Sequence, residues 1–480
     1  MKFLCIILSI LGLAHSFNEY EAVQMALEKS PNIRVSTINL THDSLNQIIT
    51  RSDAAVQAEV SGNNIIEAHP ATRMSYGDNS TTSNSIESSA GGTISKYLPG
   101  GGQLSASVTG AVSKNLDSSG SSVTTTTGVT AIQPLLKDAW SNAPIDYEIE
   151  IGKKNLAKSF EKFKSDVLEI LTEVRNSYLD WLGATRTVAI REMELNFTTE
   201  ALEYEKARFS LGEKAEMDTL SGALELLRAK EKLLSAAYEE RAAKRQLALE
   251  LGISPEDLPP LTDSLIEVNT LPSENAILAQ INKHDYELKL LDIGREILEM
   301  QQKKYGNALL PRLDVKAGVS NVQHGSMYFS GSDATASRPN VLDPWVGINF
   351  SYDIFSRKAR YQKKQAVLSL KSNNIERTYA LNQQKSEISD FLDAWKQDEA
   401  RLSIRRSEIK IAERNYEYAV QRYELGEIDN LVKLKARNDL ISARLNRLLA
   451  EMNLKKLEIA VDKVTANVLN RFGIRLENRQ

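Results

Sequence analysis

The stretch ARFSLGEKAEMDTL, residues 207–220, places Gly212 inside a run of residues that otherwise favours helix. A glycine within a helix costs about 1 kcal/mol relative to alanine, so this one needs a structural reason. The chain repeats the pattern 214 residues further on as QRYELGEIDNLVKL, residues 421–434, with Gly426 in the same place. Because glycine adopts positive φ at little steric cost, we expect each glycine to end one helix and turn the chain into the next.

The two glycines belong to a tandem repeat. At the same offset, Trp181 to Ala236 aligns without a gap on Trp395 to Ala450. The aligned positions include two tryptophans and an R-[FY]-x-L-G-E string at each glycine. Chance similarity of composition does not bring these residues into register, so the sequence encodes the same unit twice.

Each repeat has the same order of segments. An amphipathic helix comes first, from Tyr20 to about Arg51 and from Glu274 to about Asn307, and a region rich in Ser, Thr and Gly follows. A long helical pattern then leads to the glycine, and a shorter helix comes after it. The predicted divisions are a first repeat at 17–252, a proline-rich connector at 253–273, a second repeat at 274–474 and a tail at 475–480.

The helical segments that lead to the glycines are long. Ile145 to Leu211 and Ser356 to Leu425 would each extend for about 100 Å at 1.5 Å per residue. After each glycine, apolar residues recur every seven positions with Lys, Arg and Glu between them, which is typical of coiled-coil packing. Gly212 and Gly426 are therefore the predicted tips of two helical hairpins. The heptad positions are Leu220, Leu227 and Leu234 in the first repeat and Leu434, Ile441 and Leu448 in the second.

The first sixteen residues, MKFLCIILSILGLAHS, have the pattern of a secretory signal peptide that is cleaved before Phe17. Their apolar run is shorter than the roughly 20 residues that a membrane-spanning helix needs. Cys5 is the one cysteine of the chain, so we expect the exported protein to have no disulfide and no cysteine-based metal site. The formal net charge of -4 and the lack of a basic patch argue against a nucleic-acid partner.

Two regions, about 54–135 and about 311–355, alternate apolar residues with Ser and Thr and are predicted to form strands. Residues 91–112, GGTISKYLPGGGQLSASVTGAV, form a predicted hairpin around a Pro-Gly turn, and residues 72–89 read as an exposed loop. One wet face and one apolar face suit both a soluble sandwich and a barrel in an outer membrane. The aromatic residues that would border such a barrel are Tyr328, Phe329, Trp345, Phe350, Tyr352 and Phe355.

No catalytic or metal-binding motif is present in the sequence. The histidines beyond the signal segment, His42, His69, His284 and His324, are too scattered for a metal motif such as H-E-x-x-H. The glycines of LPGGG (98–102) lie in a predicted strand turn rather than in a phosphate-binding loop, and no G-x-S-x-G elbow occurs. We therefore expect no enzyme activity, no cofactor and no metal.

These features together resemble the TolC family of outer-membrane efflux and secretion ducts. The resemblance rests on the two R-[FY]-x-L-G tips with their heptads, on AVQMALEKSPNI after the signal, on AIQPLLKDAW at the end of the first strand region and on ALLPRLDV at the start of the second. It implies an α+β membrane protein built from two tandem repeats. Three copies would form a β-barrel in the outer membrane, continuous with a long α-helical coiled-coil barrel in the periplasm.

The resemblance also implies a function and partners. Such a duct is the passive channel of a tripartite efflux or type I secretion system, and it carries substrates from an inner-membrane transporter across the periplasm and the outer membrane. The implied partners are further copies of the chain in a homotrimer, a periplasmic adaptor protein, the inner-membrane transporter and outer-membrane lipid. The competing interpretation is a structural or adhesive coiled-coil protein of the cell surface, for which one continuous stalk would be more usual.

The family assigns a role to the tips. An adaptor docks on the tip turns, and a hydrogen bond near them holds the periplasmic entrance closed. The residues that match this gate are Asp218 and Tyr423. Helix termination alone would equally explain the tip glycines and leucines. The matching adaptor-contact candidates are Arg208, Phe209, Leu211, Gly212, Arg422, Tyr423, Leu425 and Gly426.

The sequence departs from the family pattern in two respects. Well-studied members have two aspartates six and nine residues beyond the second glycine, where this chain has Val432 and Lys435, and an arginine two residues beyond it, where this chain has Ile428. We therefore do not expect the family's acidic constriction. The hairpin at 91–112 is an addition to the family's usual two strands per repeat, which give twelve in the trimer. This hairpin could add strands, line the lumen or face outward.

Overall fold

The computed structural model describes residues 17–68, 84–115, 120–213, 215–261, 285–328, 335–336 and 342–476, together with Ile277, Gln280 and Ile281. The predicted signal segment, most of the connector and the end of the tail lie outside these residues. The chain divides into two compact units. The helical unit consists of Met1–Leu40, Phe160–Leu290 and Arg377–Gln480, and the sheet unit consists of Thr41–Ser159 and Leu291–Glu376.

Two helices, rather than the single one predicted from Tyr20 to Arg51, begin the described chain. They are α1 (Glu19–Lys29) and α2 (Pro31–Ser52). Ser30 has a ψ of 125°, the extended conformation that is favoured before a proline. Pro31 can start α2 because the first helical position needs no N–H donor. The proline therefore divides the predicted helix in two.

Four long helices carry the predicted tips, with one tip between the members of each pair. They are α3 (Pro144–Ser210), α4 (Glu216–Leu251), α7 (Arg357–Glu424) and α8 (Asn430–Val464). The shorter helical elements are η1 (Trp140–Asn142), η2 (Pro255–Asp257), α6 (Tyr286–Asn307) and α9 (Asn467–Arg471). Among the residues that the structure describes, no helix has both the length and the apolar character needed to cross a lipid bilayer.

Helix α6 begins at Tyr286 and not at the predicted Glu274. Asp285 lies outside the helix, and its carboxylate accepts a hydrogen bond from the Leu288 N–H at 2.9 Å. A carboxylate in this position satisfies an N–H that has no partner within the helix, so Asp285 starts a new helix. The described helical residues that precede it are Ile277, Gln280 and Ile281.

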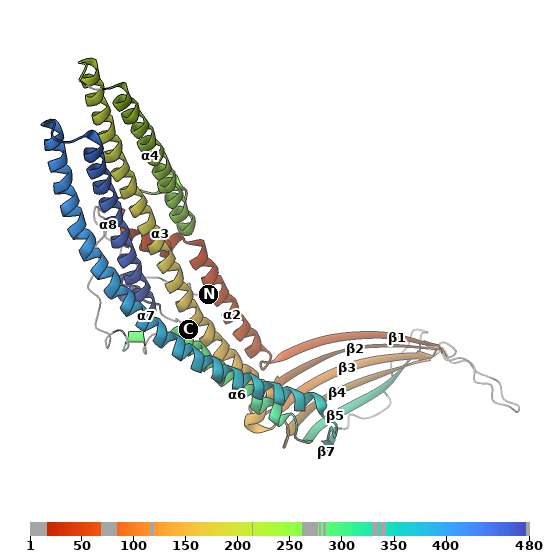
Figure 1. The fold of residues 1–480 in the computed structure, drawn as a ribbon. Coiled ribbons are helices and arrows are strands. Elements are labelled where there is room, and N and C mark those ends of the chain that lie inside the picture. The colour runs from red at the N-terminus through yellow and green to blue at the C-terminus, as the bar shows by residue number, and fades with distance from the viewer. Residues whose placement is uncertain are drawn as a thin grey trace, which may run out of the picture. The chain divides into compact units, whose positions relative to one another are not determined.

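In the helical unit, the four long helices lie side by side in the order α4, α3, α8, α7 (Figure 1). Side chains of α3 pack on both α4 and α8, and α7 packs on the other side of α8. Helices α4 and α7 are therefore the two edges of this layer. The contacts include a hydrogen bond from Trp181 Nε1 to Glu240 at 2.7 Å, the packing of Ile190 on Ile441 and Leu448, and the packing of Trp395 on Ala450 and Leu454.

A buried arginine ties four helices of this unit together. The Arg175 side chain of α3 is fully buried, and it donates hydrogen bonds to Glu19 of α1 at 2.6 Å and to Asp462 of α8 at 3.0 Å. Arg471 of α9 reaches the same Asp462 at 2.9 Å. Removing one partner of a buried ion pair costs about 3–5 kcal/mol. The cluster therefore fixes the mutual position of these helices.

The sheet unit contains one antiparallel sheet, with seven strands among the described residues (Figure 1). Strands β1 to β5 follow each other in chain order, and β6 and β7 both pair with β5. The strands are β1 (Gln57–Ala68), β2 (Asn84–Tyr97), β3 (Gln103–Asn115), β4 (Gly120–Pro134), β5 (Arg312–Tyr328), β6 (Thr335–Ala336) and β7 (Asp343–Ser351).

The hairpin predicted at residues 91–112 is part of this sheet. Its strands, β2 and β3, lie between β1 and β4 and are longer than predicted. The prediction of an exposed loop at residues 72–89 is wrong from Asn84 onward. That stretch belongs to β2 because pairing with β1 and β3 satisfies its backbone N–H and C=O groups.

The two faces of the sheet differ in polarity. Directly paired residues point to the same face, and side chains alternate along each strand, so the register assigns every side chain to a face. The apolar face carries Val60, Ile66, Ile94, Leu104, Val108, Val129, Val319, Val346, Ile348 and Phe350. The polar face carries Ser61, Asn63, Ser89, Thr93, Ser95, Ser105, Ser107, Thr109, Thr124, Thr126, Thr130 and Lys316.

Candidate functional site

Each hairpin tip ends in the same backbone motif. Gly212 follows α3 with a φ of 75°, and Gly426 follows α7 with a φ of 74°. At the first tip, the Gly212 N–H donates to the Phe209 carbonyl at 2.9 Å and the Glu213 N–H donates to the Arg208 carbonyl at 3.0 Å. The second tip repeats both bonds at 3.0 and 2.9 Å. This pair of bonds is a Schellman cap, which needs a left-handed residue, and it explains both glycines.

The two predicted tip arginines also close their own turns. Arg208 Nε lies 3.2 Å from Glu213 Oε2, and Arg422 Nε lies 3.0 Å from Glu427 Oε2. These pairs are partly exposed to solvent, so each contributes at most about 1 kcal/mol. The arginines thus have a local role, and a test of partner binding has to separate that role from a contact with another protein.

Aromatic and cationic side chains gather between the two hairpins near the tips. We call Tyr204, Arg208, Tyr423 and Lys433 the tip cluster. The rings of Tyr204 and Tyr423 are 5.9 Å apart in an edge-to-face arrangement. Lys433 Nζ lies 3.8 Å from the ring centre of Tyr423, and the Arg208 guanidinium lies 5.2 Å from that of Tyr204. Cations at these distances are attracted to the ring faces, so the cluster joins the first hairpin to the second.

Tyr423 is the most deeply buried of the predicted site residues. Burial raises the pKa of its phenol, and the negative charge of Glu205 raises that pKa further. Asp218 is also near enough for its charge to raise the pKa of Tyr423. The phenol therefore remains protonated and able to donate a hydrogen bond at neutral pH. The hydrogen bond predicted between these two gate residues stays a prediction.

Sequence reasoning missed a buried glutamate beside the tip cluster. Glu205 of α3 is 1% exposed, and the side chain of Asn430, at the start of α8, donates a hydrogen bond to it. A Cβ atom on Gly222 of α4 would lie 2.4 Å from Glu205 Oε2, so the glycine makes room for the carboxylate. The aligned residues of the second repeat are Ala419 and Ala436. The available signal in the sequence was that the first repeat has a glutamate and a glycine where the second repeat has two alanines.

Further polar contacts link α3 to its neighbours below the tips. Arg437 of α8 is buried and donates a hydrogen bond to Thr198 Oγ1 of α3 at 3.2 Å. Lys232 of α4 donates to Glu194 of α3 at 2.8 Å. Burial by itself would raise the pKa of the Glu194 carboxyl, but the hydrogen bonds from Lys232 and Arg191 outweigh it and lower that pKa. Glu194 therefore stays ionised and bonded to both cations at neutral pH.

Large apolar side chains are exposed around both tips. Leu211 and Leu425, which precede the two tip glycines, are 72% and 74% exposed. Met217 and Leu431, which follow the turns, are exposed to a similar extent. Clustered exposed apolar side chains mark surfaces that contact other molecules. The tips are therefore the best candidate for a protein-docking site in the helical unit.

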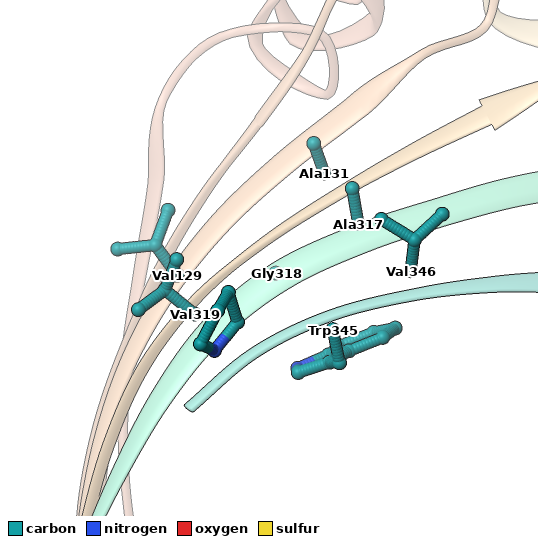
Figure 2. Close-up of a pocket in the computed structure, with 8 residues that line it drawn as sticks. Val129, Ala131, Ala317, Gly318, Val319, Trp345 and Val346 are labelled. Atoms are coloured by element: carbon teal, nitrogen blue, oxygen red, sulfur yellow. The ribbon is translucent and has the colours of Figure 1, made fainter. Parts of the chain in front are cut away.

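A second candidate surface is the apolar face of the sheet. Figure 2 shows part of this face, where Val129 and Ala131 of β4 lie beside Ala317 and Val319 of β5 and Val346 of β7. An apolar surface of this extent is suited to lipid or to another apolar surface. The opposite, hydroxyl-rich face is suited to water.

The predicted bordering aromatics fall only partly within the described residues. Trp345, Phe350, Tyr352 and Phe355 are exposed, whereas the side chains of Tyr328 and Phe329 lie outside the description. The bordering role of these residues stays a prediction.

The scattered histidines form no site in the described chain. Within the described ranges, no three His, Cys, Asp or Glu side chains are grouped as metal ligands would be. His69 and His284 lie outside those ranges.

Substituting Gly222 by alanine is expected to destabilise the first tip. The added Cβ would press on Glu205 Oε2 at 2.4 Å, and the carboxylate is held by Asn430. Forcing an extra carbon into a packed site costs about 1–3 kcal/mol. Thermal unfolding of the purified protein, compared with that of the unmodified chain, measures this loss.

A double variant provides the control. Glu205→Ala/Gly222→Ala reproduces the alanine pair of the second repeat. We expect the double variant to lose less stability than the sum of its two single variants, because the conflict is removed. Strict additivity would contradict a steric coupling between the two residues.

With the fold and the tips described, the chain can be compared with known proteins. No family model and no curated protein matches the sequence. Solved structures do match: the outer-membrane channel OprN aligns over 93% of this chain and 89% of its own, with a TM-score of 0.69 and 15% identity.

Two further structures match similarly. The CmeC outer membrane channel of Campylobacter jejuni covers 96% of this chain and 90% of its own, with a TM-score of 0.69 and 14% identity. The outer membrane protein VceC of Vibrio cholerae covers 96% and 97%, with a TM-score of 0.67 and 13% identity. All three alignments extend over nearly the whole length of both chains. The chain therefore has the fold of the TolC-family outer-membrane channels.

Proposed function

We propose that this chain is the outer-membrane channel of a tripartite efflux or type I secretion system. Three copies form a passive duct that receives substrates from an inner-membrane transporter through a periplasmic adaptor protein. The observation that carries the proposal is that the single chain leaves both edges of its helical layer and both edges of its sheet unpaired within the described residues. A fold shared with outer-membrane channels supports the same conclusion.

Within the chain, the two hairpins meet along one apolar stripe. Ile190 and Phe197, seven residues apart on α3, pack in one cluster with Ile441 and Leu448, seven residues apart on α8. The tandem repeat relates α3 to α7 and α4 to α8. The corresponding stripes are therefore Ile404 and Ile411 on α7, and Leu227 and Leu234 on α4.

These corresponding stripes are exposed in the single chain. On α4, Leu227 and Leu234 are 63% and 71% exposed, and on α7, Ile404 and Ile411 are 65% and 69% exposed. Helices α4 and α7 are the two edges of the helical layer (Figure 1). If α7 of one copy packs on α4 of the next, the new interface repeats the contact that α3 already makes with α8.

Head-to-tail interfaces of this kind generate a closed ring when the rotation allows it. Burying one leucine or isoleucine side chain stabilises by about 1.5–3 kcal/mol, so each interface gains from several such residues. A ring of three copies also places six hairpin tips at one end of the helical layer, since each copy has two.

The sheet has the same requirement for neighbours. In the described residues, β1 pairs only with β2, and β7 pairs only with β5. A backbone polar group in lipid needs a hydrogen-bond partner, so an open edge is not viable there. Pairing β7 of one copy with β1 of the next removes both edges. A closed barrel with its apolar face in lipid and its polar face toward water would then cross the outer membrane.

Efflux and secretion are not distinguished by these features, because the duct is common to both and the transporter selects the substrate. The alternative of an adhesive coiled-coil protein is less well supported. An adhesive stalk has no need for a sheet with one apolar and one polar face, nor for two hairpins related by a repeat.

The tips are proposed to dock the adaptor and to gate the entrance. The exposed Leu211 and Leu425 and the partly exposed tip arginines support docking. The proximity of Asp218 to the buried Tyr423 supports a closed entrance. Val432 and Lys435 stand where the family has two aspartates, so the proposal includes no acidic constriction of the family's kind.

Charges placed in the exposed α4 stripe are expected to prevent assembly. In Leu227→Glu/Leu234→Glu, two carboxylates would have to be buried between copies. We expect monomers in detergent by light scattering where the unmodified chain gives trimers. The control is Ser221→Glu/Ser235→Glu, which adds the same two charges at exposed positions of α4, each about 100° around the helix from the heptad leucine that precedes it. Intact trimers of the stripe variant would argue against this interface.

Charge reversal at both tips is expected to abolish export without dissociating the trimer. The variant is Arg208→Glu/Arg422→Glu, measured as substrate export in cells that carry the cognate transporter and adaptor. A matched control, Arg406→Glu/Lys410→Glu, makes the same charge change at exposed positions of α7 away from the tips and from the stripe of Ile404 and Ile411.

A charge swap separates docking from local capping. Adding Glu213→Arg and Glu427→Arg to the double variant restores an ion pair within each turn. We expect export to remain defective. Full recovery would mean that the arginines act only within their own turns.

Removing the gate contact is expected to raise single-channel conductance. Asp218→Ala and Tyr423→Phe each delete one partner, and planar-bilayer recordings of the purified trimer measure the effect. Tyr238→Phe, at an exposed position of α4, is the control. A conductance equal to that of the unmodified chain would reject the gate assignment.

A further inference from the structure

The hairpin formed by β2 and β3, residues 84–115, is built into the sheet along both of its long sides. We call it the inserted hairpin. Strand β2 pairs with β1 from Ser95 opposite Gln57 to Asn84 opposite Ala68. Strand β3 pairs with β4 along nearly its whole length. A segment that is hydrogen-bonded on both sides is part of the wall, not a plug or an appendage.

The inserted hairpin continues the polarity of both faces. On the polar face, Asn63, Ser89, Ala111 and Thr124 form one row across β1, β2, β3 and β4. On the apolar face, the neighbouring rows include Ile94 of β2 and Leu104 and Val108 of β3. Ile94 pairs with Ala58 of β1 and Leu104 pairs with Ala131 of β4, whereas Val108 pairs with Thr127 of β4. The hairpin therefore fits the same two environments as the rest of the sheet.

The turn of the inserted hairpin is fitted against the segment that follows β4. Gly100 and Gly101 have φ values of 89° and 81°. The Trp140 N–H donates to the Gly100 carbonyl at 2.8 Å, and Gln133 Nε2 donates to the same oxygen at 3.1 Å. A Cβ on Gly101 would lie 2.2 Å from the Asp138 carbonyl oxygen. The hairpin is thus fixed at its turn as well as along its sides.

The number of strands is compatible with closure. The described part of each copy contributes six long strands, β1 to β5 and β7. Because successive neighbours are antiparallel, β7 runs opposite to β1, and β7 of one copy can pair antiparallel with β1 of the next. Closed barrels of this kind have an even number of strands. Four strands per copy would also close, so the hairpin enlarges the barrel without disturbing its parity.

We propose that three copies of this chain close an eighteen-stranded barrel, to which the inserted hairpins contribute six strands. This inference rests on the proposed function, which supplies the three copies. Barrel diameter grows roughly linearly with strand number, so this barrel is about 1.5 times as wide as the twelve-stranded one expected from the family resemblance. Barrels of 16–18 strands leave an aqueous channel.

The inserted hairpin adds a hydroxyl-rich stretch to the lining of the wider barrel. On the polar face, the hairpin adds mainly serine and threonine, and Glu87 is its one charged residue there among the described side chains. The other strands place charges on the same face, among them Glu59 of β1 and Asp314 and Lys316 of β5. The lining as a whole is polar and suits hydrated solutes.

Cryo-electron microscopy of the full-length protein in lipid nanodiscs tests the proposal. We expect a trimer with eighteen strands, in which residues 84–115 lie in the wall. A second protein deletes residues 84–115 and joins residue 83 directly to residue 116; the two ends of the deleted segment lie side by side, since Ser85 pairs with Asn115. We expect twelve strands in this variant and a barrel diameter of about two thirds of the original.

The outcomes separate the two levels of the argument. A full-length trimer with twelve strands, with residues 84–115 in the lumen or outside the wall, overturns this inference and leaves the proposed duct intact. A protein that forms no closed trimer overturns the proposed function and this inference with it.

Disulfide trapping in the full-length chain provides a test that does not depend on the deletion variant. The predicted mature chain has no cysteine of its own. After oxidation in outer membranes, Asn63→Cys/Ser89→Cys and Ala111→Cys/Thr124→Cys are expected to be protected from a maleimide-polymer label. Asn63→Cys/Thr124→Cys is expected to stay labelled, because three strand spacings separate the residues by about 14 Å. A disulfide in this last pair, or none in the first two, would overturn the proposal.

Discussion

A backbone N–H or C=O group that lies in lipid without a partner costs several kcal/mol, and in the proposed duct this constraint governs the sheet. The described residues form a sheet with two open edges, β1 and β7, and with one apolar and one polar face. In the proposed duct, closure between copies satisfies both edges at once. The helical unit also has two uncovered edges. The apolar stripes on α4 and α7 are exposed, while the related stripes on α3 and α8 are packed together. In the proposed duct, the same neighbouring copies complete both units.

The tips combine a local structural requirement with a surface suited to a partner. The Schellman caps at Gly212 and Gly426 need positive φ, and the arginine–glutamate pairs close the turns. Around these caps, leucines remain exposed while Tyr204, Tyr423 and Lys433 join the hairpins. Because the interactions that close a turn and those that could bind a partner use the same arginines, substitution of an arginine alone cannot assign its role. The charge swap within each turn is informative for this reason.

The two repeats have diverged where they meet different surroundings. In the described residues the first repeat supplies four strands and the second supplies two long ones, because β2 and β3 are inserted only in the first. At the tips, Glu205 and Gly222 occupy positions where the second repeat has Ala419 and Ala436. The glutamate faces Asn430 of the other hairpin within the same chain. Its repeat-related position, Ala419, lies on α7 at the edge of the helical layer. The buried polar contact of Glu205 therefore lies where the two hairpins of one chain meet, and the repeat-related position on α7 has an alanine instead.

Local physics made much of this fold readable in the sequence. Glycine at two repeat-related positions, heptads after them, and alternating strands with a Pro-Gly turn reflect constraints between near neighbours in the chain, so the two tips and the strand regions could be predicted. Asp218 and Tyr423 could be matched only through the family resemblance. Other features depend on residues far apart in the chain. The partner of β2, the exposed state of Leu227 against the buried state of Ile441, and the contact of Glu205 with Gly222 and Asn430 follow from which elements pack together. The pattern of residues along the chain shows which side chains share one face of a helix or strand. Which other element covers that face is decided by the tertiary structure.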